Sequence, residues 1–112
     1  MVNVEIVLDQ DGILLSCRAS GHAGAGKSGA DIVCAAVSVL IRTVIRTLSK
    51  KEGVVIRGDA PEPGLVWMEA DYSAEGKASL AAAGEFLAEG LGSVAEEFPD
   101  NCKLIVRTDR RT

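Results

Sequence analysis

Two hydrophobic periods meet at a glycine-rich segment, residues 21–29, and this change of period most constrains the fold of the chain. Before the segment, two runs alternate apolar and more polar residues: Val2, Val4, Ile6 and Leu8, then Ile13, Leu15, Cys17 and Ala19. Such alternation is typical of half-buried strands. The intervening residues 9–12 (Asp-Gln-Asp-Gly) favour a turn, so the sequence predicts an antiparallel hairpin.

A helix is predicted after the glycine-rich segment, from about residue 31 to residue 50. Apolar residues recur there at helical spacing: Val33, Val37, Leu40, Val44 and Leu48, with Ile41 and Ile45 beside them. Ser28 or Asp31 can cap the start of this helix by accepting a hydrogen bond from an exposed backbone N–H. Gly53 follows its end.

The rest of the chain predicts three more strands and a second helix. Strands are expected at residues 54–57, 65–70 and 102–107, a turn at 59–64 and a helix at 77–98. The order β-β-α-β-β-α-β predicts an α+β fold, a two-layer sandwich with two helices on one face of a mixed, largely antiparallel sheet. The other face of the sheet would then be only partly polar, which suggests dimerisation.

Composition excludes several classes of function. The 112 residues predict one domain, residues 1–112, and a net charge of −4 without a run of Lys or Arg argues against direct nucleic-acid binding. No apolar run is long enough to span a bilayer, and no signal peptide is recognised, so no membrane association is expected. Three cysteines without paired spacing favour a reducing cytoplasm, and neither a metal nor another cofactor is expected.

The glycine-rich segment joins the only histidine, His22, to a cysteine near the predicted helix start, Cys34. Unpaired N–H groups and the dipole at a helix N-terminus favour a thiolate and could stabilise an oxyanion. If the loop folds back over the helix, His22 can hold this thiolate as an ion pair and then protonate a leaving amine. The segment therefore predicts a Cys/His nucleophile pair, although a helical cysteine can also be a small core residue.

Other side chains of the helix could support this pair. Asp31, Cys34 and Ser38 share one side of the helix because they are three and four residues apart, and Arg42 continues the line. Asp31 could orient the imidazole or merely cap the helix. Ser38 could bond the sulfur or the substrate, or be structural, and Arg42 is interpreted as part of a solvated face.

Substrate contacts are expected from glycines of the loop. These would admit a peptide backbone closely and let the loop move as a lid: Gly21, Gly24 and Gly26. Trp67, Met68 and Tyr72 are possible apolar liners of a specificity pocket, with core packing the preferred interpretation for the first two.

The same residues also satisfy a competing motif. Residues 21–28 match the phosphate-loop pattern G-x-x-x-x-G-K-[ST], in which Lys27 would contact phosphate oxygens and Ser28 a magnesium ion. A nucleotide-binding module of this kind needs a parallel sheet with crossover helices, whereas this chain begins with a predicted hairpin. The motif is therefore the second interpretation.

The segment also resembles the signature of the ribosomal-processing cysteine protease Prp family. The signature consists of Gly21-His22, a variable glycine-rich loop, and residues 31–38 (Asp-Ile-Val-Cys-Ala-Ala-Val-Ser). The preceding hairpin and the strand–helix–strand ending look like the family too, so the resemblance covers nearly the whole chain. It implies a small cytoplasmic bacterial endopeptidase, usually dimeric, with a two-layer α/β fold.

The resemblance further implies His22 and Cys34 as the catalytic pair, with Asp31 and Ser38 as supporting residues. It implies that the substrate is the N-terminal extension of a large-subunit ribosomal protein, number twenty-seven, cut after a hydrophobic, phenylalanine-containing segment. Lys27 and Ser28 depart from the family's usual loop, which affects the expected contacts of the lid. The third interpretation is a non-catalytic ribosome-assembly dimer that only binds the ribosomal protein's tail.

Overall fold

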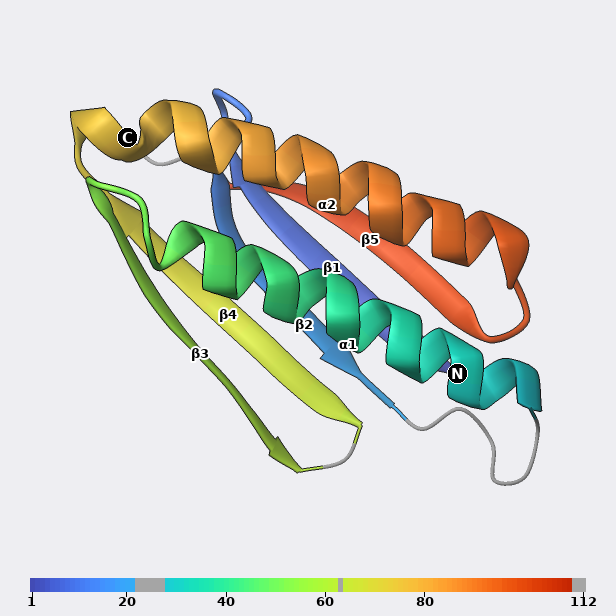
Figure 1. The fold of residues 1–112 in the computed structure, drawn as a ribbon. Helices are drawn as coiled ribbons and strands as arrows, with labels where there is room; N and C mark the ends of the chain where they lie inside the picture. Colours follow the sequence, from blue (N-terminus) through green and yellow to red (C-terminus); the bar gives the residue numbers. More distant parts are fainter. Residues whose placement is uncertain (22–27, 63, 110–112) are drawn as a thin grey trace.

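The computed structural model describes residues 1–21, 28–62 and 64–109, which form five strands and two long helices (Figure 1). The elements are β1 (Val2–Asp9), β2 (Leu14–Ser20), α1 (Ser28–Leu48), β3 (Val54–Glu62), β4 (Leu65–Tyr72), a 3₁₀ turn (Ala74–Gly76), α2 (Lys77–Glu97) and β5 (Cys102–Asp109). Within the described ranges, neither helix combines the length and the apolar composition that a bilayer crossing requires.

The strands form one mixed sheet in the order β3-β4-β2-β1-β5. β1 pairs in parallel with β5, and the other neighbours are antiparallel. Both helices lie on the same face of this sheet, side by side and running in opposite directions (Figure 1). The predicted element order and the α+β, two-layer class are confirmed.

The core lies between the helices and the sheet. The alternating residues of β1 and β2 and the helical stripes of α1 and α2 bury most of their apolar members there. Among the fully buried side chains are Ile6, Cys17, Ile41, Met68, Leu80, Leu87 and Leu91. Leu40, predicted on the buried stripe of α1, is only half-buried because its side chain lies between the helices, 3.3 Å from where a Cβ on Gly90 would stand.

The predicted turn at residues 59–64 is wrong in extent, because β3 continues to Glu62. Glu62 pairs with Leu65 of β4, so the hairpin reverses within the residues between them, and Gly64 adopts φ +85°. Pro61 has no N–H to donate to a ladder, and β3 accommodates it because β3 is an edge strand whose register shifts between Asp59 and Glu62.

The sheet face away from the helices is largely charged. An ion pair joins the Arg107 guanidinium to Glu5 at 3.6 Å, and another joins Arg57 to Asp71 at 4.0 Å. Each pair spans two neighbouring strands. The expected mixture of polar and apolar residues is present, since Ile105 on β5 is 49% exposed.

Candidate active site

A cleft of about 470 Å³ lies at the end of the sheet where β2 stops and α1 begins. Its walls come from α1, from the adjoining ends of β1 and β2, and from the reversal between β3 and β4. A larger hollow, about 540 Å³, lies between the two helices, and its described lining includes neither Cys34 nor Ser38.

One wall of the cleft is a line of side chains on α1. Cys34, Ser38 and Arg42 all border it, as their four-residue spacing on a helix requires. Cys34 and Ser38 are half-buried and Arg42 is exposed. The Arg42 Nε donates a hydrogen bond to the Ser38 carbonyl oxygen at 3.3 Å, which ties the guanidinium to the wall of the cleft rather than leaving it wholly in solvent.

Gly21 closes the cleft at the end of β2. Its φ of +115° is a backbone conformation that only glycine adopts readily, and a Cβ at this position would collide with the Met1 carbonyl oxygen. The Gly21 N–H donates to the Gly64 carbonyl oxygen at 2.9 Å. This bond holds the β3–β4 reversal beside the end of β2, so both border the same cleft.

The third wall was not predicted from the sequence. Ala60, Pro61 and Glu62 of β3 and Leu65 and Val66 of β4 line the cleft opposite α1. They reach it because β4 pairs with β2, which places Leu65 opposite Ser20, next to Gly21. Local sequence patterns do not report which strand a hairpin adjoins, although the Pro-Gly composition of the reversal was a signal for a surface loop.

Several predicted site residues fall outside the described part of the chain. His22, Gly24, Gly26 and Lys27 lie outside the described residues. Asp31 belongs to α1 by its backbone, and its side chain is not described. The structure therefore brings Cys34, Ser38 and Gly21 to one cleft, and the predicted pairing of His22 with Cys34 stays a prediction.

The position of Cys34 within α1 differs from the expectation. The helix begins at Ser28 rather than near residue 31, so Cys34 lies in its second turn. The unpaired N–H groups and the strongest part of the helix dipole belong to the first turn. The predicted stabilisation of a thiolate at Cys34 by the helix N-terminus is therefore weaker than for a cysteine in the first turn.

The other two thiols have environments unsuited to nucleophilic chemistry. Cys17 is completely buried in the core, and this burial raises the pKa of its thiol to about 12. Cys102 is 3% exposed, and burial, followed by the charge of Cys34, raises the pKa of its thiol as well. Both keep their protons at neutral pH.

None of the three proposed specificity liners borders the cleft. Met68 is fully buried in the core, as preferred from the sequence. Trp67 pairs with Arg18 across the sheet and is only half-buried, so core packing is the wrong interpretation for this residue. Tyr72 lies at the far end of β4, where its hydroxyl donates to Asp9 Oδ2 at 2.9 Å.

The sheet also argues against the phosphate-loop interpretation. A phosphate loop follows a strand of a parallel sheet, whereas β2 is antiparallel to both of its neighbours, β1 and β4. Across the described ranges, no three His, Cys, Asp or Glu side chains gather closely enough to hold a metal ion.

Comparisons with known proteins agree with a thiol-based site. The family model for the cysteine protease Prp matches residues 1–103. A search among curated proteins finds no match.

Solved structures of the same fold align over nearly the whole chain. SMU.848 from Streptococcus mutans is 27% identical, with a TM-score of 0.77 over 97% of this chain and 96% of that one. The essential ribosomal processing protease Prp from Staphylococcus aureus, in complex with a substrate peptide, is 18% identical. Its TM-score is 0.79, and the alignment covers 96% of this chain and 100% of that one. The structure of the Staphylococcus aureus Prp in complex with a covalently linked product peptide aligns with 21% identity and a TM-score of 0.76. This alignment also covers 96% of this chain and 100% of that one.

Proposed function

The chain belongs to the cysteine protease Prp family, and from this premise we propose that it removes the N-terminal extension of large-subunit ribosomal protein twenty-seven during ribosome maturation. The observation that carries the proposal is the contrast among the three cysteines. Cys34 borders a cleft on the polar side of α1, whereas Cys17 and Cys102 are buried in the core. A nucleophile must meet its substrate, and only Cys34 is placed to do so.

In the proposed reaction, His22 takes the thiol proton of Cys34, and the sulfur attacks the scissile carbonyl carbon. The carbonyl π electrons move to oxygen, forming a tetrahedral oxyanion. Its collapse breaks the C–N bond while His22 returns the proton to the leaving amine. This step leaves an acyl-enzyme and a released peptide with a new amino terminus.

Hydrolysis of the acyl-enzyme completes the cycle. His22 takes a proton from water, the hydroxide attacks the thioester carbon, and the C–S bond breaks. The extension then leaves as a carboxylic acid, and Cys34 recovers its proton. Asp31 is proposed to orient the imidazole, and Ser38 to hydrogen-bond the sulfur or the substrate, since Ser38 borders the cleft one turn beyond Cys34.

The cleft suits an extended peptide with apolar side chains. Val2, Val37 and Leu65 border the cleft from three different elements, and Leu65, which is half-buried, exposes more apolar surface than the other two. Gly21 has no side chain to obstruct a peptide backbone beside them. Arg42 and Glu62 are the exposed charged residues among its lining. A hydrophobic, phenylalanine-containing segment, as the family resemblance implies, would bury its side chains against the apolar part.

The proposal includes the setting in which the enzyme works. It acts in the cytoplasm as a homodimer, with the ribosomal protein's extension as its peptide partner and without direct contact to nucleic acid or membrane. The net charge of −4 supports the absence of nucleic-acid binding. The free state of all three cysteines is consistent with a reducing compartment.

A cleavage assay tests the proposal directly. The purified chain is incubated with a peptide that spans the junction between the extension and the mature ribosomal protein. Wild-type protein should cleave at a single bond, and Cys34→Ala and His22→Ala should each abolish cleavage. Cys34→Ser is the near-isosteric control for folding, and Cys102→Ala should keep most of the activity because Cys102 lies outside the cleft lining.

The alternatives predict other results. Tight binding of the uncut peptide by wild-type protein, without cleavage, would support the ribosome-assembly dimer. Saturable ATP binding that is lost in Lys27→Ala and kept in Cys34→Ala would support the phosphate-loop module. Loss of cleavage in Cys34→Ala alone, with His22→Ala fully active, would remove His22 from the mechanism.

A further inference from the structure

The active-site cleft carries two opposite charges on facing walls. Arg42 lies on α1, and Glu62 ends β3 on the wall opposite α1; both side chains are exposed. The other described residues of the lining have no carboxylate, ammonium or guanidinium group. Within the described part of the chain, neither Arg42 nor Glu62 forms an ion pair. The cleft therefore presents a cation and an anion that can both bind a peptide.

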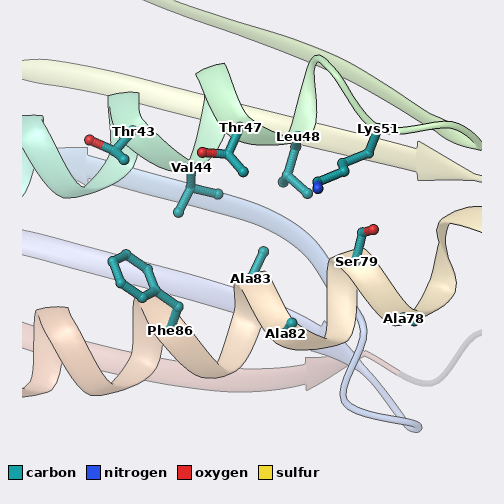
Figure 2. A pocket seen from close by; sticks show the side chains of 10 residues that line it. All are labelled: Thr43, Val44, Thr47, Leu48, Lys51, Ala78, Ser79, Ala82, Ala83 and Phe86. Atoms are coloured by element: carbon teal, nitrogen blue, oxygen red, sulfur yellow. The ribbon is translucent and has the colours of Figure 1, made fainter.

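The larger hollow between the helices offers no such pair of charges. Figure 2 shows the side chains around it, and among these described lining residues Lys51 alone is charged. The others are threonine, serine and apolar side chains. Opposite charges on facing walls thus distinguish the active-site cleft from the larger hollow.

The guanidinium of Arg42 is held at a defined place along α1. Its Nε donates to the Ser38 carbonyl oxygen at 3.3 Å, which turns the side chain back toward Cys34, the usual direction of a long side chain on a helix. The terminal nitrogens are left to donate to a ligand. Ser38 is one turn from Cys34, about 6 Å along the helix axis. Because an extended chain advances about 3.3 Å per residue, a peptide running along α1 passes the guanidinium about two residues from the scissile carbonyl.

Glu62 reaches the same level of the cleft from the opposite wall. α1 and β3 run in opposite directions (Figure 1), and they meet where the Ile45 Cδ1 lies 3.1 Å from the place that a Cβ on Gly58 would occupy. From this contact, Ser38 lies about 10 Å back along α1, and Glu62 lies about 13 Å further along β3. The Arg42 guanidinium beside Ser38 and the Glu62 carboxylate are therefore at a similar level on facing walls.

An extended peptide would meet the two charges at neighbouring residues. Successive side chains of an extended chain point to opposite sides, so one faces α1 and the next faces the wall formed by β3 and β4. Apolar side chains of the peptide displace water from the cleft, and the loss of water strengthens each electrostatic contact. An opposite charge on the peptide then favours binding, and a like charge opposes it.

We propose that Glu62 and Arg42 determine specificity: Glu62 selects a basic side chain of the peptide, and Arg42 rejects one at the neighbouring position. The inference rests on the proposed protease function and deepens it by naming the charge pattern that the cleft accepts. Chains that bind ribosomal RNA are rich in lysine and arginine, which supply the cation for Glu62.

The two charges together are more selective than either one alone. Glu62 alone would accept any basic segment, of which an RNA-binding protein has many. Arg42 adds the repulsive element, so a segment that is basic at both positions is excluded. The apolar part of the cleft therefore does not decide alone where the substrate is cut.

Cleavage of a peptide series tests the inference. Lys, Gln or Glu is placed at one position at a time, up to about four residues on either side of the scissile bond, and kcat/KM is measured with the full chain. Wild-type protein should prefer Lys to Glu about tenfold at one position, as expected for a charged hydrogen bond, and should disfavour Lys at an adjacent position. Glu62→Lys should reverse the first preference, and Arg42→Glu should reverse the second.

Two matched variants control for the change in net charge. Glu52→Lys alters an exposed glutamate just before β3, at the opposite end of that strand from Glu62. Arg46→Glu alters an exposed arginine one turn beyond Arg42 that does not border the cleft. Both variants should keep the wild-type preference at every position of the series.

Two results overturn the inference: equal cleavage of Lys and Glu peptides by wild type at every position, or the same shift of preference in Glu52→Lys as in Glu62→Lys. Binding of the same peptides to Cys34→Ala, measured by fluorescence anisotropy, needs no turnover. A charge preference in binding without any cleavage by wild type would overturn the protease and keep the roles of Glu62 and Arg42. Cleavage without a charge preference would keep the protease and overturn these roles.

Discussion

The hydroxyl of Tyr72, the last residue of β4, donates a hydrogen bond to Oδ2 of Asp9, the last residue of β1, at 2.9 Å. Asp9 is 6% exposed, and its Oδ1 also accepts from the backbone N–H groups of Asp11 at 2.8 Å and Ile13 at 3.0 Å. One carboxylate therefore fixes the β1–β2 turn and ties it to a strand two places away in the sheet.

Replacing Tyr72 by Phe should lower the free energy of unfolding by about 1–2 kcal/mol, because the buried Asp9 carboxylate loses a donor. Urea denaturation measures this loss. Peptide cleavage should be unchanged, since Tyr72 is at the opposite end of β4 from the cleft residue Leu65. If Tyr72→Phe and Asp9→Ala are additive in the double variant, the two residues do not interact.

Alkylation should distinguish the three thiols in the native protein. Iodoacetamide is expected to modify Cys34 and to spare Cys17 and Cys102, because these are 0% and 3% exposed and burial raises the pKa of each thiol. Peptide mass spectrometry after brief labelling identifies the modified residue. All three should react once urea unfolds the chain, and equal labelling without urea would contradict the proposed site.

Gly21→Ala should destabilise the protein by more than about 2 kcal/mol, because the new Cβ meets the Met1 carbonyl oxygen in a left-handed backbone conformation. Gly12→Ala is the matched control. Gly12 also has a positive φ, +80°, but a Cβ there meets nothing within 4 Å, so its cost should be only about 1 kcal/mol. Thermal melts of both variants compare them, and equal losses would show that the contact with Met1 does not matter.

Alkaline pH should destabilise the fold through Cys17. Below the ordinary thiol pKa of 9.0, both folded and unfolded states hold the proton, and the stabilisation is complete. As the pH rises from 9 toward 12, the unfolded thiol ionises while the folded one does not, so the free energy of unfolding falls by up to about 1.4 kcal/mol per pH unit.

Cys17→Ala removes this dependence but costs stability at every pH, so the stability curves of variant and wild type should converge above pH 9. Denaturant titrations between pH 8 and 11 provide the curves. Cys34→Ala is the control, because the Cys34 thiol is not buried in the core. Its removal should leave unchanged the fall in the free energy of unfolding that Cys17 causes above pH 9. If the curves for Cys17→Ala and wild type stay parallel between pH 8 and 11, Cys17 does not cause the loss of stability at alkaline pH.

Local patterns were sufficient for the elements of this fold. Strict alternation in residues 2–19 and a helical stripe in residues 31–50 describe burial against one common core, so each pattern predicts its element directly. The predicted boundaries of these elements were less accurate: α1 begins at Ser28 rather than near residue 31, and β3 continues to Glu62 rather than ending at residue 57. The extension of β3 depends on its pairing with β4, a partner that a local window does not contain.

The candidate site could be predicted only along α1. The four-residue spacing of Cys34, Ser38 and Arg42 brings them to one side of a helix whatever surrounds it. The opposite wall depends on β4 lying beside β2, a pairing between segments far apart in the chain. The link between Tyr72 and Asp9, 63 residues apart, was unpredictable for the same reason.

The parallel pairing of β1 with β5 has a consequence for the order in which the enzyme becomes competent. Val2 borders the cleft, and its N–H donates to the Asn101 carbonyl oxygen while Cys102 pairs alongside it. A nascent polypeptide emerging from the ribosome lacks this flank until residues 101–109 have been translated. The wall of the cleft at Val2 is therefore held by the last strand of the sheet to be translated, so the cleft cannot reach its final geometry before β5 exists.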